Sequence, residues 1–334
     1  MAWSVESLAA RVRTGRPADR DDALQLLEAA RVNPWPVLAA ADDLRRHFRG
    51  SRIHLCGIAA VKLGRCGEDC RWCAQSAHWH AGVEPRGLLP TGDLVRAARE
   101  AAGNRASSFG LVTSGSRLSD AERALVVEAA RAIGRETGLE VCGSFGALDR
   151  EAAAALREAG FRRYNHNLET SARHFPNVCT THTYEDRLRT ARAVREAGLA
   201  LCSGGIFGVG EAGEDRVDVA VAVRDLGAAV VPLNFLDAIP GTPLGVAKPL
   251  APLEILATVA MFRFVLPDRT IKLAGGRERN LRNLQALMFF AGADACLVGN
   301  YLTTTGRPAE EDLAMLRDLG LEPAADRADE ARHA

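Results

Sequence analysis

The sequence predicts an α/β protein, a (β/α)8 barrel of the TIM type with an N-terminal helical extension. Three observations predict this fold. Eight strand-like apolar segments follow one another between residues 53 and 300, and amphipathic segments of helix length separate them. Strands joined in this way form parallel sheets, and eight of them can close a barrel. The chain has 334 residues, 47% of them hydrophobic, which is enough for one large core.

The N-terminal part is expected to be helical. The stretch ALQLLEAARV at 23–32 repeats its apolar residues at three- to four-residue spacing, and LAAADDLRRHF at 38–48 follows after a proline break. Beyond it, strand and helix patterns alternate, and a polar, alanine-rich tail ends the sequence. We therefore expect a helical extension at 1–50, a barrel at 51–322 and a tail at 323–334.

The expected strands are apolar runs bounded by glycine, proline or polar residues. They are residues 53–61, 107–114, 139–145, 162–168, 199–206, 228–235, 270–276 and 295–300. Helices between them, such as 118–138, 149–160 and 184–198, end in a glycine suited to a helix C-cap. An open doubly wound sheet is the competing fold, but it should carry a glycine-rich phosphate turn after its first strand. Three cysteines occupy that turn here.

Composition argues against several classes of function. The 42 basic and 42 acidic residues give a formal net charge of zero, and aromatic residues are only 5%, so no nucleic-acid partner is expected. No apolar run is long enough for a bilayer, and the first residues lack a signal-peptide core, so we expect a cytoplasmic protein without a membrane partner. In a reducing compartment, clustered cysteines are expected to bind metal or act in catalysis.

Cys66, Cys70 and Cys73 follow the first expected strand with the spacing Cys-x3-Cys-x2-Cys. Their loop lies at the barrel end where enzymes of this fold keep their active sites. Three thiolates on one loop can hold three irons of a [4Fe–4S] cluster and leave the fourth iron open. Zinc is the alternative, because His78 and His80 are near enough to complete four ligands. Three unrelated surface thiols are a weaker interpretation, since exposed reactive thiols are a liability.

The triplet, with Trp72 directly before its last cysteine, resembles the signature of the radical S-adenosylmethionine (SAM) enzymes. In that superfamily, the amino and carboxylate groups of SAM chelate the open iron. The resemblance implies that an electron from the cluster cleaves SAM and gives a 5′-deoxyadenosyl radical, which attacks unactivated C–H bonds. It also implies a [4Fe–4S] cluster and SAM as cofactors, with Trp72 near SAM. The triplet alone leaves the substrate open.

The end of the fourth expected strand, YNHNLETS at 164–171, carries polar side chains at alternating positions. Asn165, Asn167 and Glu169 should point the same way from an extended chain. At the mouth of a barrel they suit a polar, neutral ligand that forms hydrogen bonds. A solvated loop is the alternative, but a loop has little need of this alternation. We therefore predict a binding site.

This segment resembles the biotin synthase family, and the resemblance covers roughly residues 40–320. Further matching motifs follow in the family's order, which makes the assignment specific. They are TTHTYEDR at 180–187, CSGGI at 202–206, NF at 234–235, GTPL at 241–244 and GRE at 276–278. The resemblance implies that radicals from SAM activate two carbons of dethiobiotin and that a second iron–sulfur cluster donates the bridging sulfur. The implied activity is that of a radical SAM sulfurtransferase.

The same resemblance assigns roles to single residues. Asn165, Asn167 and Asn234 match positions that hold dethiobiotin or SAM. Glu169 stands where the family usually has an aspartate, which binds the ribose hydroxyls of SAM. Arg187 matches the residue that pairs with the SAM carboxylate, a charge-assisted contact.

The glycine-containing segment 204–211, GGIFGVGE, fits the superfamily element Gly-x-Ile-x-Gly-x-x-Glu. By that resemblance, Ile206 packs on the adenine of SAM. The segment lacks Gly-x-Gly-x-x-Gly spacing and follows the fifth expected strand, so it does not indicate a dinucleotide-binding fold. An ordinary strand-to-helix turn remains the alternative.

The sulfur-donating site departs from the family pattern, which is a [2Fe–2S] cluster on three cysteines and one arginine. Cys142 and Cys202 match two of the cysteines. Gly110 occupies the position of the third cysteine, and Lys272 occupies that of the arginine. Interior layers of a barrel take side chains from alternate strands. Cys142, Cys202 and Lys272 lie on the third, fifth and seventh expected strands. Cys56, on the first, would complete their layer, although a buried free cysteine often only fills space. We hypothesise an auxiliary cluster here, [2Fe–2S] or a larger one of four irons, with Lys272 nearby.

The remaining cysteines and histidines carry weaker expectations. Cys179 is either a second candidate ligand of the auxiliary cluster or a loop thiol, and Cys296 is expected in the core. Five histidines show no clear base or ligand pattern, and most are expected to be structural. They are His78, His80, His166, His174 and His182.

The resemblance also implies partners: a reducing protein such as flavodoxin or ferredoxin, the iron–sulfur assembly machinery and a second copy in a homodimer. Two alternatives stay open. Another radical SAM enzyme of this subgroup, of the hydrogenase-maturation or methylornithine-synthase type, would share the fold and the triplet but lack YNHNLETS. A non-catalytic iron–sulfur or zinc-binding module would have no reason to carry both Glu169 and Arg187.

Overall fold

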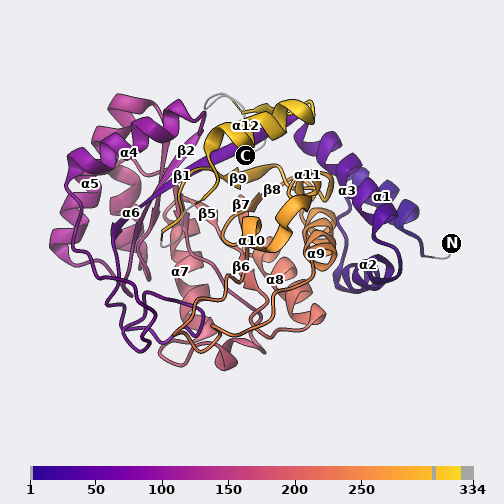
Figure 1. Ribbon diagram of the computed structural model, residues 1–334, viewed down its shortest axis with the longest axis horizontal. Coiled ribbons are helices and arrows are strands. Elements are labelled where there is room, and N and C mark those ends of the chain that lie inside the picture. Colours follow the sequence, from indigo (N-terminus) through magenta and orange to yellow (C-terminus); the bar gives the residue numbers. More distant parts are fainter. Residues whose placement is uncertain (1–2, 303–305, 325–334) are drawn as a thin grey trace.

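The structure is a computed structural model that describes residues 3–302 and 306–324. Its centre is a closed barrel of parallel strands (Figure 1). The strands are β1 (Arg52–Lys62), β2 (Ser108–Thr113), β3 (Glu140–Ser144), β4 (Arg163–Asn165), β5 (Ala200–Cys202), β6 (Gly205–Phe207), β7 (Val230–Phe235), β8 (Thr270–Leu273) and β9 (Ala295–Leu297). The barrel closes because β1 pairs with β2 on one side and with β9 on the other. The predicted (β/α)8 barrel is confirmed.

One position of the barrel is shared by two short strands. The expected strand 199–206 divides into β5, which pairs with β4 and β7, and β6, which continues along β7. Gly204 lies between them, so close to β7 that an added Cβ would stand 1.9 Å from the carbonyl oxygen of Pro232. The strand breaks where the backbone makes this close approach, and only glycine can occupy the position.

Helices cover the outside of the barrel (Figure 1). They are α4 (Thr91–Gly103), α5 (Asp120–Thr137), α6 (Arg150–Glu158), α7 (Tyr184–Glu196), α8 (Gly213–Asp225), α9 (Pro252–Val265), α10 (Arg277–Leu281), α11 (Leu287–Phe290) and α12 (Ala309–Asp318), with 3-10 turns η1 (Phe175–Asn177) and η2 (Arg282–Leu284). Capping boxes at Ser119 and Thr183 begin α5 and α7. Gly138 ends α5 in the left-handed conformation, as its position predicts. Within the described residues, no helix has both the length and the apolar character needed to cross a bilayer.

The N-terminal helices α1 (Val5–Arg13), α2 (Arg20–Val32) and α3 (Pro34–Arg49) pack against the flank of the barrel beside α9 (Figure 1). Their buried residues belong to the same hydrophobic cluster as those of the barrel. At the other end, β10 (Glu322–Pro323) pairs with the start of β1. The expected tail therefore begins inside a paired strand, and its residues 325–334 lie outside the described residues.

A buried ion pair joins α9 to the segment before β9. Arg263 Nη2 lies 2.5 Å from Asp294 Oδ1, with both side chains fully buried, and Arg49 Nε lies 2.8 Å from Asp294 Oδ2. We expect Asp294→Ala to lower the free energy of unfolding by about 3–5 kcal/mol, because it leaves Arg263 buried without its counter-charge. Asp225→Ala, which breaks an exposed pair, should cost less than about 1 kcal/mol. Urea unfolding of both variants tests this, and equal losses would contradict it.

Candidate active site

The cysteine triplet lies on the loop that follows β1, at the carboxyl end of the barrel strands. Cys66, Cys70 and Cys73 all line one cavity of about 490 Å³. The loop closes on itself through hydrogen bonds from Cys66 N to Gln75 O and from Cys73 N to Cys70 O, both 3.0 Å. Three thiols that share one loop and one cavity are a donor set that fits a [4Fe–4S] cluster with one open iron.

Arg187, from α7, lies on the same cavity. Its Nη1 donates to the carbonyl oxygen of Asn167 at 3.0 Å and lies 3.5 Å from Glu169 Oε1. Its Nε is buried and has no hydrogen-bond partner among the described residues. A buried, unpartnered donor of positive charge beside a cavity suits an anionic ligand group such as a carboxylate.

Glu169 reaches the cavity through an unusual backbone conformation. Its φ of 69° lies in the left-handed region, which aspartate and asparagine adopt more readily than glutamate. The conformation is held by Ile206 N, which donates to Glu169 O at 2.7 Å. Burial raises the pKa of the Glu169 carboxyl, and the positive charge of Arg187 opposes that rise. Backbone strain of this kind is concentrated at functional sites.

Only the first part of the segment YNHNLETS is a strand, although its alternating polar side chains were expected to share one extended chain. Asn165, Asn167 and Glu169 do line the same cavity, but β4 ends at Asn165 and the left-handed turn brings Glu169 round. The prediction of one extended chain from Asn165 to Glu169 is therefore wrong. The chain leaves β4 after Asn165, and Glu169 pairs with Gly205 of β6. Asn167 Oδ1 accepts a hydrogen bond from Gly204 N at 3.2 Å.

Asn234 and Ile206 lie on a neighbouring cavity of about 290 Å³. Asn234 Nδ2 donates to Gly205 O at 3.1 Å, and its Oδ1 accepts from Gly275 N at 2.9 Å. Its side chain thus connects β6 to the loop after β8. Ile206 and Trp72 pack against the same buried apolar cluster. Both line this neighbouring cavity, and Trp72 also lines the mouth cavity.

A deeper cavity of about 220 Å³ lies inside the barrel and shares Ser144, Asn165 and Asn167 with the mouth cavity. Four side chains from alternate positions round the barrel line it. They are Cys56 on β1, Cys142 on β3, Cys202 on β5 and Lys272 on β8.

Lys272 is the charged residue of this group. Its Nζ lies 4.0 Å from Cys56 Sγ and 3.9 Å from Cys202 Sγ. Burial alone would lower the pKa of Lys272, but the negative charges of Cys202 and Cys56 outweigh it and raise that pKa. Burial raises the pKa of Cys142 and Cys202. The positive charge of Lys272 opposes this effect of burial on both thiols. It favours the thiolate form, which is the form that binds metal.

Gly110 also lines the deep cavity. A Cβ at this position would lie 3.1 Å from Ile58 Cγ2. A larger side chain would therefore both crowd Ile58 and fill part of the cavity.

The sequence interpretation missed Arg163 at this site. Arg163 is buried, lines the deep cavity and pairs with Glu140 at 2.8 Å. Its position on β4, two residues before Asn165, indicates that both side chains face the same way. A charged residue at the start of a short strand is normally expected at the surface, so the strand pattern alone does not place Arg163 in the barrel.

Cys179 and Cys296 lie away from the deep cavity. Cys296 is buried in the hydrophobic core, as expected. Cys179 lies at the mouth, with its Sγ 3.9 Å from that of Cys70. The hydrogen bond from Cys70 lowers the pKa of Cys179 to about 5 and raises the pKa of Cys70. Cys179 therefore does not join the deep group of cysteines, because the loop after β4 places it beside the cysteine triplet.

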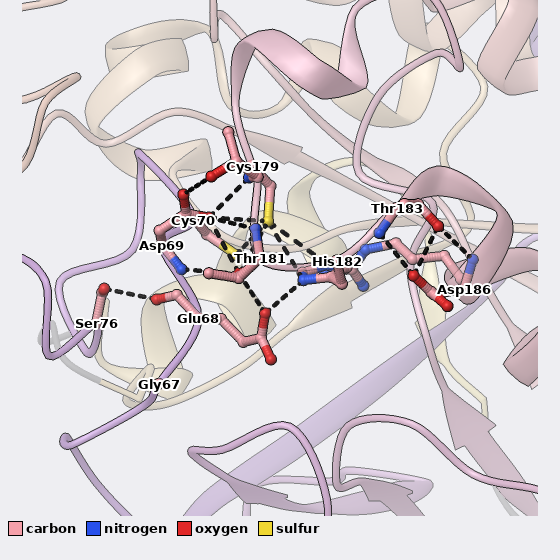
Figure 2. A network of polar contacts seen from close by, with 12 residues as sticks. Gly67, Glu68, Asp69, Cys70, Ser76, Cys179, Thr181, His182, Thr183 and Asp186 are labelled. Carbon is pink, nitrogen blue, oxygen red and sulfur yellow. Dashed lines mark hydrogen bonds and ion pairs between the residues drawn. The ribbon is translucent and has the colours of Figure 1, made fainter.

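Among the five histidines, His182 departs from the structural role expected of most of them. His182 Nδ1 lies 3.3 Å from Cys179 Sγ, beside the triplet (Figure 2). His78 and His174 contact backbone carbonyl oxygens through their Nε2 atoms, at 3.0 and 3.3 Å. The group of close metal-ligating side chains among the described residues is Cys70, Cys179 and His182, and it includes neither His78 nor His80.

His166 is buried on the mouth cavity, and burial lowers its pKa well below 6.5. The unfolded chain takes up a proton at this residue below about pH 6.5, whereas the folded chain does not. The free energy of unfolding should therefore fall as the pH drops, by up to about 1.4 kcal/mol per pH unit from this group. The variant His166→Gln should show a shallower fall between about pH 6.5 and 5 in urea unfolding. Identical slopes for both proteins would refute the prediction.

Two family descriptions match the chain. "Radical SAM superfamily" matches residues 61–222, and "Biotin and Thiamin Synthesis associated domain" matches residues 232–322. Biotin synthase of Geobacter sulfurreducens is 50% identical over 95% of this chain and 96% of its own length. This chain belongs to the biotin synthase family. Biotin synthase of Heliobacterium modesticaldum is 47% identical over 92% of this chain and 94% of its own.

Solved structures agree on the fold. Methylornithine synthase superposes with a TM-score of 0.81 at 20% identity, over 97% of this chain and 98% of its own. A maturase of the [FeFe]-hydrogenase gives the same TM-score at 15% identity, over 98% of this chain and 77% of its own. At these identities the likeness concerns the barrel alone. Membership of the biotin synthase family makes the chain a radical SAM sulfurtransferase, and it disfavours both the two related enzyme types and a non-catalytic module. Membership of the family also implies a [4Fe–4S] cluster and SAM as cofactors.

Proposed function

We propose that this chain converts dethiobiotin to biotin with SAM bound at the mouth of the barrel, dethiobiotin below it and the sulfur source deepest. One observation carries this proposal. Two groups of cysteines line two cavities, and Ser144, Asn165 and Asn167 line both of these cavities. A substrate held by these three residues would have the radical source above it and the sulfur source below it.

At the mouth, Cys66, Cys70 and Cys73 would hold the [4Fe–4S] cluster. When bound, that cluster supplies the electron that cleaves SAM to a 5′-deoxyadenosyl radical. Glu169 would accept hydrogen bonds from the ribose hydroxyls, and the Arg187 guanidinium would pair with the SAM carboxylate through its unpartnered Nε.

Apolar and polar contacts would complete the binding of both ligands. Ile206 and Trp72 offer the apolar surface against which an adenine ring packs. Asn165 and Asn167 offer amide groups that both donate and accept hydrogen bonds, which suits the cyclic urea of dethiobiotin with its two N–H groups and one carbonyl. Asn234 uses one donor and one acceptor on the backbone and keeps a second N–H for a ligand.

In the deep cavity, Cys56, Cys142 and Cys202 would hold the auxiliary cluster, which is consumed as the sulfur substrate. Three thiols, with Lys272 at the position of the family's arginine ligand, favour a cluster of four irons with an extra sulfide over a [2Fe–2S] cluster. Lys272 would offset the negative charge of thiolates and sulfide. Glycine at position 110 leaves part of the cavity free for the larger cluster.

Mössbauer spectra of a Cys66/Cys70/Cys73→Ala variant, with iron and sulfide quantitation, test the auxiliary cluster. We expect about four irons per chain on the deep site, since the variant removes only the mouth ligands. A two-iron signal, or no cluster, would overturn the four-iron proposal.

The reaction itself is tested by anaerobic incubation of the cluster-loaded chain with SAM, dethiobiotin and a reductant. We expect both biotin and 5′-deoxyadenosine. If 5′-deoxyadenosine forms without biotin, the chain is a radical SAM enzyme of another specificity, and if neither forms, the proposal fails.

The same proposal includes three partners. They are a flavodoxin or ferredoxin that reduces the chain, the iron–sulfur assembly machinery that refills its cluster, and a second copy of the chain in a homodimer. Analytical ultracentrifugation tests the last of these.

A further inference from the structure

Cys179 and His182 have no part in the proposed reaction, yet both lie against the cysteine triplet. One donor atom each from Cys70, Cys179 and His182 lies within 4.8 Å of the others. Figure 2 shows the sulfur of Cys179 directed toward Cys70 and His182. Cys70 and Cys179 are buried, and His182 is half-buried. Two thiols and an imidazole in one place are a set of ligands that binds zinc.

The distances fit a single tetrahedral ion. With Zn–S bonds of about 2.3 Å and Zn–N bonds of about 2.0 Å, tetrahedral geometry places two sulfurs roughly 3.8 Å apart and a sulfur and a nitrogen roughly 3.5 Å apart. The Cys70 and Cys179 sulfurs are 3.9 Å apart. Cys179 Sγ lies 3.3 Å from His182 Nδ1 and 3.8 Å from its Nε2. All three donor atoms lie within 4.8 Å of one another, so movements of the side chains alone would bring them onto one ion.

The surroundings of His182 have the arrangement that metal-binding histidines usually show. Glu68 Oε2 lies 2.6 Å from His182 Nδ1, so the carboxylate accepts that N–H and leaves Nε2 as the ligand nitrogen. The cysteine loop is fixed to the Cys179 segment by Asp69, whose Oδ1 accepts from Thr180 N at 2.8 Å and from Thr181 N at 3.1 Å (Figure 2). These contacts hold Cys70 and Cys179 side by side across two loops.

We propose that the chain, before it receives its radical cluster, binds one zinc ion through Cys70, Cys179 and His182. Cys70 and His182 line the mouth cavity, so water can fill the fourth position. Because Cys70 is also a ligand in the triplet, zinc and the [4Fe–4S] cluster exclude each other. Zinc would thus hold the two loops together in the apo protein and compete with cluster delivery.

Titration of the metal-free, full-length chain with Co²⁺ and Zn²⁺ tests the proposal. We expect one tight site per chain with the absorption of tetrahedral, thiolate-bound cobalt, which zinc displaces. Cys179→Ser and His182→Gln should each weaken zinc binding by roughly 100-fold or more, because each removes a ligand. Glu68→Gln should weaken it by about 10–100-fold, since it removes only the partner that orients the ring.

The matched control is Cys66→Ser, which removes a triplet cysteine outside the proposed zinc site and should leave zinc affinity within about 3-fold. If Cys66→Ser abolishes binding while Cys179→Ser does not, zinc binds the triplet and the proposal is overturned. X-ray absorption of the zinc-loaded parent chain provides a measurement that does not depend on folding of the variants. It should give two sulfurs and at least one nitrogen, and a shell of three or more sulfurs would sink the assignment. Pre-loading with zinc should also block [4Fe–4S] reconstitution until a chelator is added.

Discussion

Replacing Cys202 with alanine should abolish biotin formation and leave SAM cleavage in place. Cys202 lines the deep cavity beside Lys272 and contributes nothing to the mouth cavity where SAM is proposed to bind. Loss of this ligand should remove the sulfur source without removing the radical source. We expect biotin to fall by at least about 100-fold, while 5′-deoxyadenosine is still produced. Quantifying both products in one anaerobic reaction measures the effect.

The control for that experiment is Cys296→Ala. Cys296 is buried on β9, in the hydrophobic core and outside the described lining of the deep cavity. The variant carries the same chemical change as Cys202→Ala, and it should keep biotin formation near the parent level. Parent-level biotin from Cys202→Ala, or equal damage from both variants, would show that the deep site is not the sulfur source.

Cys66→Ala should instead stop the formation of both biotin and 5′-deoxyadenosine. Cys66 lines only the mouth cavity, and its loss leaves two thiols for a cluster that needs three. We expect 5′-deoxyadenosine formation to fall by at least about 1000-fold, because no later step proceeds without the radical. Iron bound to the deep site should remain, so the Mössbauer signal proposed for the auxiliary cluster should persist.

The two variants together separate the sites. Cys66→Ala should lose SAM cleavage and keep the auxiliary iron, whereas Cys202→Ala should keep SAM cleavage and lose that iron. Retained SAM cleavage in Cys66→Ala would refute the assignment of the triplet. Loss of both iron signals in either variant would mean that the two sites do not assemble independently.

Much of the fold and part of the site could be predicted from sequence, because both depend on local sequence patterns. The periods of strands and helices are local properties, so eight strands between helices indicated the barrel. The triplet is local too, since its three thiols lie within eight residues of one loop. Even the approach of Cys56, Cys142, Cys202 and Lys272 to one cavity follows from a regular rule, the alternation of inward-facing residues on alternate strands.

Only the tertiary structure decided features that depend on contacts between distant segments or on irregular backbone. Glu169 reaches the cavity through a left-handed turn that no periodicity describes. Cys179 faces Cys70 across 109 residues of sequence, because the loops after β1 and β4 meet at the barrel mouth. Sequence by itself thus determined the barrel, the triplet and the family, all of which rest on local pattern. The fold alone decided which side chains from separate loops meet, because loop paths at the mouth are set by long-range packing.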